Sequence, residues 1–258
     1  CVSSEGGLPF YKIQHKFACI AWEETMSRTK STMLILILSS LTFLIFFPGH
    51  VSIAAEISLP KPSYKGAVSV EEALKARRTH RSFTSRSLTL KQFSQILWGA
   101  YGVTDQKYGS FLKTAPSAGA LYPLDIYGVV GKGGVENLVE GVYHYNPEDH
   151  TASLLREGDL RADVARQSLH QMWVAKAPLT LVITGEYERS SIKYGPRGVT
   201  YTHIEAGCVG QNIFLQAEAI GLKAGIVGAF NNRDVVKTMG LPANHDPLLI
   251  MPVGFSPD

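Results

Sequence analysis

The segment 178–185 constrains the fold more than any other stretch of this chain. It reads Pro-Leu-Thr-Leu-Val-Ile-Thr-Gly, and its apolar residues run together without the alternation of a half-buried strand. A short run of this kind is typical of a strand that is covered on both faces. We therefore expect a strand here that lies in the middle of a sheet.

Pairs of residues with the form of a capping box predict the starts of three helices. In a capping box, a Ser or Thr side chain and a Glu or Gln three residues later satisfy two backbone amides reciprocally. The three pairs are Ser69 with Glu72, Thr89 with Gln92, and Thr202 with Glu205. The third helix runs to Ile220, before Gly221, and has little polar face. We expect it to be buried, in part against a partner chain.

Other patterns place strands and helices along the rest of the chain. Apolar runs bounded by turn residues predict strands at 124–130, 224–230 and 248–253, and a hairpin that joins 141–145 to 151–155. Asp159 can cap a helix that runs to about Trp173, and Asn231 or Asn232 can cap one that ends at Gly240. Strands and helices are mixed and one hairpin is present, so we expect an α+β fold with a central mixed sheet.

The N-terminal region has the features of a targeting segment. The chain begins with Cys1, so we interpret 1–25 as an upstream extension that precedes a start at Met26. Arg28 and Lys30 then precede an apolar run at 33–47 and small residues up to 55, which predicts an export signal over 26–55. The signal is either cleaved near residue 55 or retained as a membrane anchor. Either alternative implies an exported or periplasmic location, or one anchored at the membrane. The protein is cytoplasmic if this segment is a gene-start artefact. The remaining residues, 56–258, form one domain.

Charge and cysteine content exclude several classes of function. The chain has 25 Lys and Arg residues against 22 Asp and Glu residues, a net charge of +3, so nothing indicates a nucleic-acid surface. Three cysteines match neither a disulfide framework nor a zinc site, and no two histidines lie four residues apart. We therefore expect no metal site and no nucleic-acid partner.

Three segments contain side chains that can carry chemistry. The first, 77–81, holds three guanidiniums and a hydroxyl after a helix; such a group either complements the helix dipole as a solvated cluster or binds a phosphate. The second, 114–123, is a loop of small residues that a flat ligand can approach closely. In the third, 193–198, a lysine stands beside a phenol in a loop after a strand, as an acid–base pair or as a surface turn.

Taken together and in order, these segments resemble the FMN-dependent nitroreductase family, in particular its azoline dehydrogenase branch (SagB/ThcOx type). The resemblance extends over about 68–255. The matching stretches are short and collinear: 77–83, 115–123 with Tyr127, 177–178, 193–195 with 197–198, 210–212 with Ala217, 221–222, 228–230 and 252–254. One departure is the chain end, Phe255-Ser256-Pro257-Asp258, where many relatives have a basic residue that reaches the phosphate.

The resemblance implies an intertwined homodimer of nitroreductase-like fold with FMN in two clefts at the interface. It also implies three sets of cofactor-binding residues. By this resemblance, the phosphate and ribityl chain are bound by Arg77, Arg78, Thr79 and Arg81. The flavin ring is contacted by Pro116, Ser117 and Ala118 of the partner subunit. Main-chain groups near the reactive flavin nitrogen are supplied by Gly228 and Ala229.

The resemblance assigns Lys193 and Tyr194 as catalytic residues that remove a proton while hydride leaves for the flavin. It implies an FMN-dependent oxidoreductase that acts on a small-molecule or peptidic substrate, as a dehydrogenase of azoline rings. Two alternatives stay open. One is an NAD(P)H-dependent reductase of nitro compounds or quinones, for which NAD(P)H is a transient visitor because no dinucleotide-binding fingerprint is present. The other is a noncatalytic flavin-binding protein of the same fold.

Overall fold

The expected central strand lies near the middle of the observed sheet. In the computed structural model, which describes residues 56–107 and 109–257, strand β7 (Leu179–Gly185) pairs with β4 on one side and β9 on the other, and all its residues are buried. The extension expected at 1–25 and the signal expected at 26–55 lie outside the described residues. Within those that are described, no helix has the length and apolarity needed to cross a membrane.

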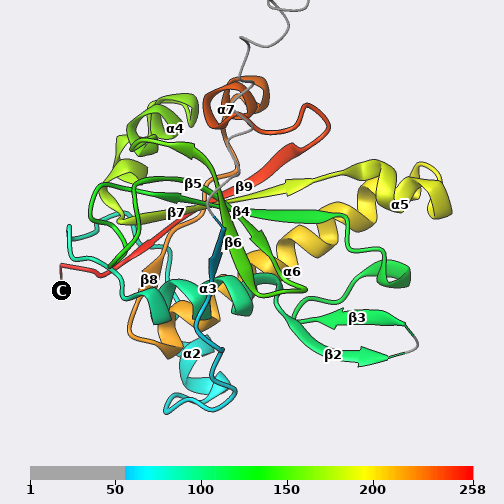
Figure 1. The fold of residues 1–258 in the computed structure, drawn as a ribbon, viewed down its shortest axis with the longest axis horizontal. Helices are drawn as coiled ribbons and strands as arrows, with labels where there is room; N and C mark the ends of the chain where they lie inside the picture. The colour runs from blue at the N-terminus through cyan, green and yellow to red at the C-terminus, as the bar shows by residue number, and fades with distance from the viewer. Residues whose placement is uncertain (1–55, 108, 258) are drawn as a thin grey trace, which may run out of the picture. The chain divides into compact units, whose positions relative to one another are not determined.

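The main sheet has seven strands in the order β1-β6-β5-β4-β7-β9-β8 (Figure 1). Besides β7, its strands are β1 (Glu56–Ser58), β4 (Leu124–Val130), β5 (Gly141–Asn146), β6 (Thr151–Glu157), β8 (Lys223–Ala224) and β9 (Asp246–Gly254). A separate hairpin pairs β2 (Val103–Lys107) with β3 (Ser110–Lys113). The α+β class is confirmed. The mixed pairing that we expected is limited to isolated parallel bridges, because every ladder of the described sheet is antiparallel.

Helices cover both faces of this sheet, which explains why β7 is apolar throughout. The helices are α2 (Val70–Ala76), α3 (Leu90–Tyr101), α4 (Arg161–Gln167), α5 (Tyr187–Tyr194), α6 (Arg197–Ala219) and α7 (Asn232–Met239), with 3-10 turns η1 (Ala118–Ala120) and η2 (Met172–Lys176). Side chains of α3 and α6 pack with Leu181 and Ile183 in one core, whereas α4 and α7 pack with Val182 in a second core. Figure 1 shows these two helix pairs on opposite sides of the strands.

The helix starts test the capping-box predictions. At Ser69 and at Thr89 both reciprocal hydrogen bonds are present, so these two predictions are confirmed. The third is wrong, because α6 begins at Arg197 and Thr202 lies inside it, where its hydroxyl donates to Gly198 O at 2.9 Å. Glu205 is consequently free to make a tertiary contact.

Two other elements are shorter than expected. The helix expected at 159–173 ends at Gln167, because Leu169 and His170 take positive φ angles of 52° and 58°, which no α-helix accommodates. The strand expected at 224–230 is reduced to β8 and a single bridge from Val227 to Ile250. Residues 228–230 therefore run past the sheet edge without pairing, which leaves their backbone open to another group.

Candidate active site

The arginine segment 77–81 lies against the edge strand β8. Helix α2 ends at Ala76 with Arg77 as its C-cap, and the chain then pairs with β8: Thr79 bridges to Ala224, and His80 N donates to Ala224 O at 2.9 Å. This backbone pairing fixes the segment at the end of the sheet where β9 finishes. The sequence prediction that the basic residues follow the end of a helix is confirmed.

The guanidiniums of this segment differ in what they contact. Arg78 donates to the carbonyl oxygens of Lys75 and Arg77 at 2.9 and 2.8 Å, so it caps the last turn of α2. Arg77 stacks over the Phe214 ring at 5.2 Å, and Arg81 lies 5.8 Å from the Trp173 ring. Within the described part of the chain, neither Arg77 nor Arg81 forms an ion pair with a carboxylate. Their charge is therefore available to an anion.

Gly228 and Ala229 lie along the same sheet edge. Both are exposed, and a Cβ atom added to Gly228 would meet no atom within 4 Å. Trp173 links them to the arginines, because its ring packs on Gly225, and the neighbouring Gln171 donates to Ala229 O at 3.4 Å. The structure thus brings Gly228, Ala229 and the arginine segment together on one edge.

Pro116, Ser117 and Ala118 belong to a loop that lies along the middle of α6. The hydroxyl of Ser117 accepts a hydrogen bond from Tyr122 N at 2.9 Å, and the side-chain amide of Asn212 donates to Thr114 O at 3.2 Å. Pro116 is exposed at the loop surface. These bonds give the small-residue loop a defined shape without the help of bulky side chains.

Lys193 and Tyr194 lie on the last turn of α5 rather than in the loop that we expected. The helix ends after them because Gly195 takes a φ of 55° and Pro196 follows. Both side chains converge on Gly119: a Cβ added there would lie 2.6 Å from the Tyr194 hydroxyl and 3.0 Å from Lys193 Nζ. The structure thus places the lysine, the phenol and the small-residue loop side by side.

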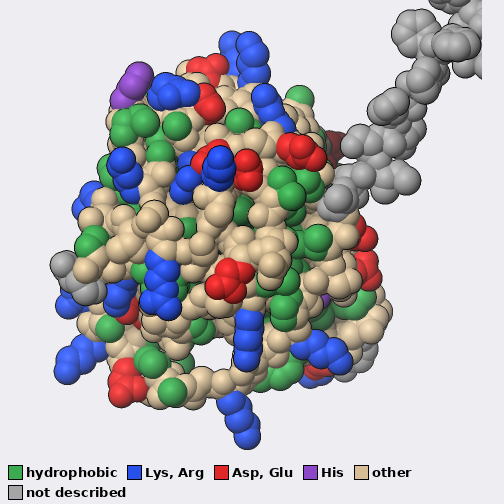
Figure 2. Space-filling view, turned by 60° about the vertical axis from the view of Figure 1, so that its left-hand side comes forward, with side chains coloured by type: hydrophobic (Ala, Val, Ile, Leu, Met, Phe, Trp, Pro, Cys, Tyr) green, Lys and Arg blue, Asp and Glu red, His purple; other side chains and the backbone are tan. Residues whose placement is uncertain are grey.

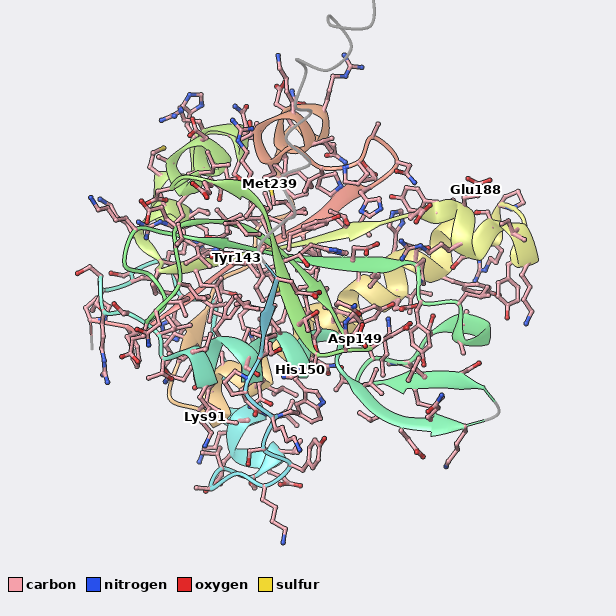
Figure 3. The ribbon with its side chains drawn as sticks, in the orientation of Figure 1. Lys91, Tyr143, Asp149, His150, Glu188 and Met239 are labelled. Atoms are coloured by element: carbon pink, nitrogen blue, oxygen red, sulfur yellow. The ribbon has the colours of Figure 1, made fainter. Side chains whose placement is uncertain are left out.

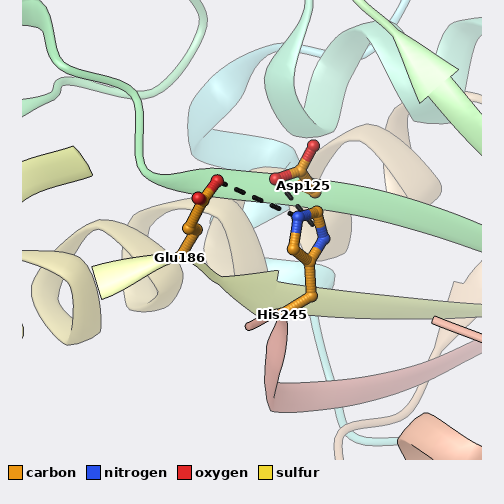
Figure 4. A group of neighbouring side chains, drawn as sticks. All are labelled: Asp125, Glu186 and His245. Carbon is orange, nitrogen blue, oxygen red and sulfur yellow. Dashed lines mark ion pairs between the residues drawn. The ribbon is translucent and has the colours of Figure 1, made fainter. Parts of the chain in front are cut away.

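A charged cluster under α5 holds that helix on the sheet. Asp125 and Glu186 both pair with Arg189, at 2.9 and 2.5 Å, and His245 lies 3.7 Å from Asp125 and 3.9 Å from Glu186 (Figure 4). Burial raises the pKa of Asp125, but the hydrogen bond from His144 and the charge of Arg189 outweigh it, and the pKa lies below its usual value. The two carboxylates and His245 have the spacing of metal ligands, yet the guanidinium already pairs with both carboxylates. We read the cluster as an anchor for α5.

Glu205 is a residue of this region whose role the sequence did not reveal. It is only 3% exposed and accepts a hydrogen bond from the Tyr101 hydroxyl at 2.5 Å. The capping-box pattern concealed it, since the same Thr-x-x-Glu spacing has a different use inside a helix. Glu205 lies four residues before the apolar Val209, a spacing that places both side chains on one face of a helix. This spacing is the sequence signal that could have revealed the burial of Glu205.

The predicted site residues therefore form two groups that lie apart. One group, 77–81 with Gly228 and Ala229, lies at β8; the other, 116–118 with Lys193 and Tyr194, lies beside α5. Phe214 contacts the first group and Tyr201 packs edge-on against Tyr194 in the second, so about 20 Å of α6 separates them. Figures 1 and 3 show β8 at the left and α5, marked by Glu188, at the right.

Charge is dispersed on the face of the molecule that Figure 2 presents. Figure 2 shows Lys and Arg side chains scattered among acidic ones on the face that it presents, with no continuous basic stripe. A duplex nucleic acid requires such a stripe to follow its phosphates. The local supply of unpaired guanidiniums at β8 is therefore a feature of the site rather than of this face as a whole.

Comparison with known proteins assigns the family. Residues 74–255 match the model of the nitroreductase family. The chain is 41% identical over 199 residues to a nitroreductase-family protein of Methanocaldococcus jannaschii, MJ1384. The aligned region covers 77% of this chain and 96% of that protein. A Ralstonia eutropha JMP134 crystal structure described as a nitroreductase aligns with a TM-score of 0.67 and 29% identity, over 79% of this chain and 90% of that chain.

A third relative is a chain of a synthetase complex. The structure of the Escherichia coli microcin synthetase McbBCD, with truncated pro-MccB17 bound, aligns with a TM-score of 0.58 and 25% identity over 78% of this chain and 79% of that chain. The resemblance to the nitroreductase family that the sequence indicated is thus confirmed, and the chain belongs to that family as an oxidoreductase.

Proposed function

We propose that this oxidoreductase binds FMN in a cleft formed by two copies of the chain and uses it to oxidise azoline rings, in a small or peptidic substrate, to azoles. The proposal has a cofactor part and a reaction part. Each depends on a different group of residues and has its own test.

The residues at β8 fit the phosphate end of FMN. Arg77 and Arg81 are cations without a carboxylate partner in the described chain, and guanidinium forks bind phosphate oxygens in pairs. Thr79 adds a hydroxyl, and Arg78 contributes charge while it caps α2. Gly228 has open space where a Cβ would project, so a flat group can approach the backbone of Gly228 and Ala229. These residues would hold the phosphate and the flavin edge.

Pairing of two α6 helices explains how both groups can reach one cofactor. Gly207 and Cys208 lie at the middle of the 23-residue α6, where a Cβ on Gly207 would meet no atom within 4 Å, and Ile204 next to them is 58% exposed. A glycine at the centre of a helix face, with an exposed apolar side chain beside it, allows close helix approach. If two copies pair antiparallel across Gly207, Tyr201 of each lies near Phe214 of the other. The loop 116–118 of one copy then faces the arginines of its partner.

One observation carries the reaction part: Lys193 Nζ and the Tyr194 hydroxyl converge on Gly119 beside the loop that would face the flavin. Oxidation of an azoline removes one hydride and one proton from the ring, and FMN, when bound, accepts the hydride. The proton needs a basic group within hydrogen-bond reach. We assign proton removal to Lys193, with the Tyr194 phenol beside it. The likeness to the microcin synthetase, whose structure has truncated pro-MccB17 bound, supports a peptidic substrate.

The cofactor part is tested by comparing FMN with riboflavin, which lacks the phosphate. The double variant Arg77→Gln/Arg81→Gln should bind FMN at least about tenfold more weakly than the parent, because each lost contact is a charge-assisted hydrogen bond. Its affinity for riboflavin should stay unchanged. Isothermal titration of both flavins measures this, with Arg156→Gln on β6, distant from β8 in the strand order, as the control. Equal FMN affinity in the double variant and the parent would remove the phosphate site.

The reaction part is tested with the FMN-loaded protein and an azoline-containing peptide. Lys193→Ala should lower the rate of azole formation by about 10²-fold or more, as expected for loss of a positioned base, and Tyr194→Phe should lower it less. FMN affinity and reduction of the flavin by NADH or NADPH should not change in either variant. If nitro compounds or quinones are reduced by NAD(P)H and no azoline is oxidised, the protein is a reductase and the azoline proposal fails.

A further inference from the structure

Glu205 is a carboxyl group placed inside an apolar core. It is 3% exposed and lies on the face of α6 that Ala206 and Val209 turn toward the sheet. A buried carboxyl group is costly unless hydrogen bonds replace its lost hydration. A glutamate at this position is therefore held by specific partners, and these partners identify what it does.

Two hydroxyl groups and one cation face the Glu205 carboxyl group. The Tyr101 hydroxyl donates to Oε1 at 2.5 Å, the Ser117 side chain also hydrogen-bonds to the carboxyl group, and Lys113 is the cation that faces it. Burial raises the pKa of Glu205 above its usual value. The hydrogen bonds from Ser117 and Tyr101 and the charge of Lys113 act in the opposite direction but do not cancel this rise. Lys113 Nζ lies between two aromatic rings, 4.3 Å from the centroid of the Tyr101 ring and 4.7 Å from the centroid of the Tyr122 ring.

The contacts of Ser117 show how Glu205 acts on the loop. The Ser117 hydroxyl accepts from Tyr122 N at 2.9 Å, and toward Glu205 it donates its single hydrogen. That hydrogen is therefore not available to a cofactor, and the loop presents the Pro116 ring and its backbone outward instead. Glu205 thus ties the middle of the loop to α6, the helix that would also form the dimer interface.

We propose that Glu205 is a positioning residue for the flavin: it does not touch the cofactor, but it fixes Ser117 so that the loop 116–118 presents its backbone to the flavin of the partner copy. This inference rests on the proposed FMN site. It predicts that removing the carboxyl group changes how the flavin is held without changing the arginine segment at β8.

The test compares variants of Glu205 for flavin binding and for the flavin spectrum. Glu205→Leu keeps the approximate volume and removes both hydrogen bonds, so FMN and riboflavin should both bind about tenfold more weakly, and the visible bands of bound flavin should shift. Glu205→Gln keeps an acceptor oxygen and should restore most of the affinity. Thr202→Val is the matched control, because it removes a buried hydrogen bond from the same helix, to Gly198 O, without touching the loop.

The loop partner gives a second, independent measurement. Ser117→Ala should weaken both flavins to a similar extent as Glu205→Leu, and the double variant should be no weaker than either single variant, because both changes break one link. If Glu205→Leu does not fold, the flavin affinities of Ser117→Ala and Glu205→Gln test the inference in its place. Parental affinity and spectrum in all folded Glu205 and Ser117 variants would overturn the inference. Failure of the parent to bind FMN would instead overturn the proposed function on which it rests.

Discussion

Gly119 is the residue whose lack of a side chain leaves room for Lys193 and Tyr194. Its backbone takes a φ of 64° and a ψ of 17°, in the left-handed region that glycine enters at no steric cost. The two polar atoms nearest to it belong to the ends of flexible side chains, which can move away from an added methyl group. A substitution at Gly119 therefore separates backbone strain from the placement of the proposed proton-transfer pair.

Gly119→Ala should lower both stability and turnover, whereas Gly133→Ala should lower stability alone. Gly133 has a similar φ of 62°, but a Cβ added there meets no atom within 4 Å. An alanine in the left-handed region costs about 1–2 kcal/mol, so the free energy of unfolding should fall by a similar amount in both variants. Displacement of Lys193 and Tyr194 should lower azoline turnover about tenfold or more in Gly119→Ala. Thermal unfolding and steady-state kinetics measure the two effects; equal turnover in both variants would contradict the assignment.

At this scale, the sequence indicated the chemistry of single residues better than their contacts. The arginines after α2 and the pair Lys193-Tyr194 were selected as candidates from residue type and order. The role of Glu205 was not, because Thr202 and Glu205 have the spacing of a capping box wherever they stand in a helix. Local spacing does not reveal that a tyrosine far away in the chain supplies the hydrogen bond.

The elements around the site are held in place by short polar links at their ends. Asp159, before α4, is the clearest example: its carboxylate accepts from Lys132 N at 3.1 Å and from Arg161 Nη2 at 2.6 Å. Arg161 in turn donates to Ala177 O at 2.8 Å. One carboxylate thus connects the end of β4, the start of α4 and the residues before β7.

Asp159→Asn should lower the melting temperature at neutral pH, by an amount that disappears in acid. Burial raises the pKa of Asp159, but the hydrogen bonds from Arg161 and Lys132 prevail and lower it from 3.8 to about 2. The stabilisation is therefore fully present above pH 4 and is lost as the pH falls through 2. We expect a decrease of roughly 3–6 °C at pH 7.

Melting curves of the parent and the variant between pH 7 and pH 2 measure this difference. Asp163→Asn is the control, because Asp163 pairs with Arg166 on the exposed surface of the same helix, where a salt bridge contributes little. A difference between Asp159→Asn and the parent that stayed constant down to pH 2 would show that the charge of Asp159 is not its source.

Element prediction succeeded where the signal was local and failed where it was not. The caps at Ser69 and Thr89 and the continuous apolar run of β7 depend on neighbouring residues, and all three were found from the sequence. The start of α6 was displaced because Arg197 follows α5 after a turn of two residues and has no side-chain cap. The strand at 224–230 was too long because its partner, β9, pairs with β7 along its length and with β8 at only two residues.

At the scale of the whole molecule, one copy of the chain holds the two proposed groups of site residues apart from each other. The proposed phosphate-binding group contacts Phe214 and the proposed proton-transfer pair contacts Tyr201, near opposite ends of α6, and the face of α6 between them exposes Gly207 and Ile204. Antiparallel pairing of two such helices would complete two equivalent sites at once. Cofactor binding and dimer formation should therefore be a single property of this protein.

Gly207→Trp should abolish both properties together while leaving the single chain folded. A Cβ at Gly207 meets no atom within 4 Å, and replacing a helical glycine favours the helix. The substitution should therefore not destabilise the single chain. Any decrease in the melting temperature should come only from loss of the partner. A bulky ring in the centre of the interface should hold the two helices apart. Sedimentation should then give half the parental mass, and FMN affinity should fall at least about 100-fold. Val139→Trp, at a 54% exposed position between β4 and β5, should change neither measurement. A Gly207→Trp monomer that binds FMN as tightly as the parent would show that one chain forms the whole site.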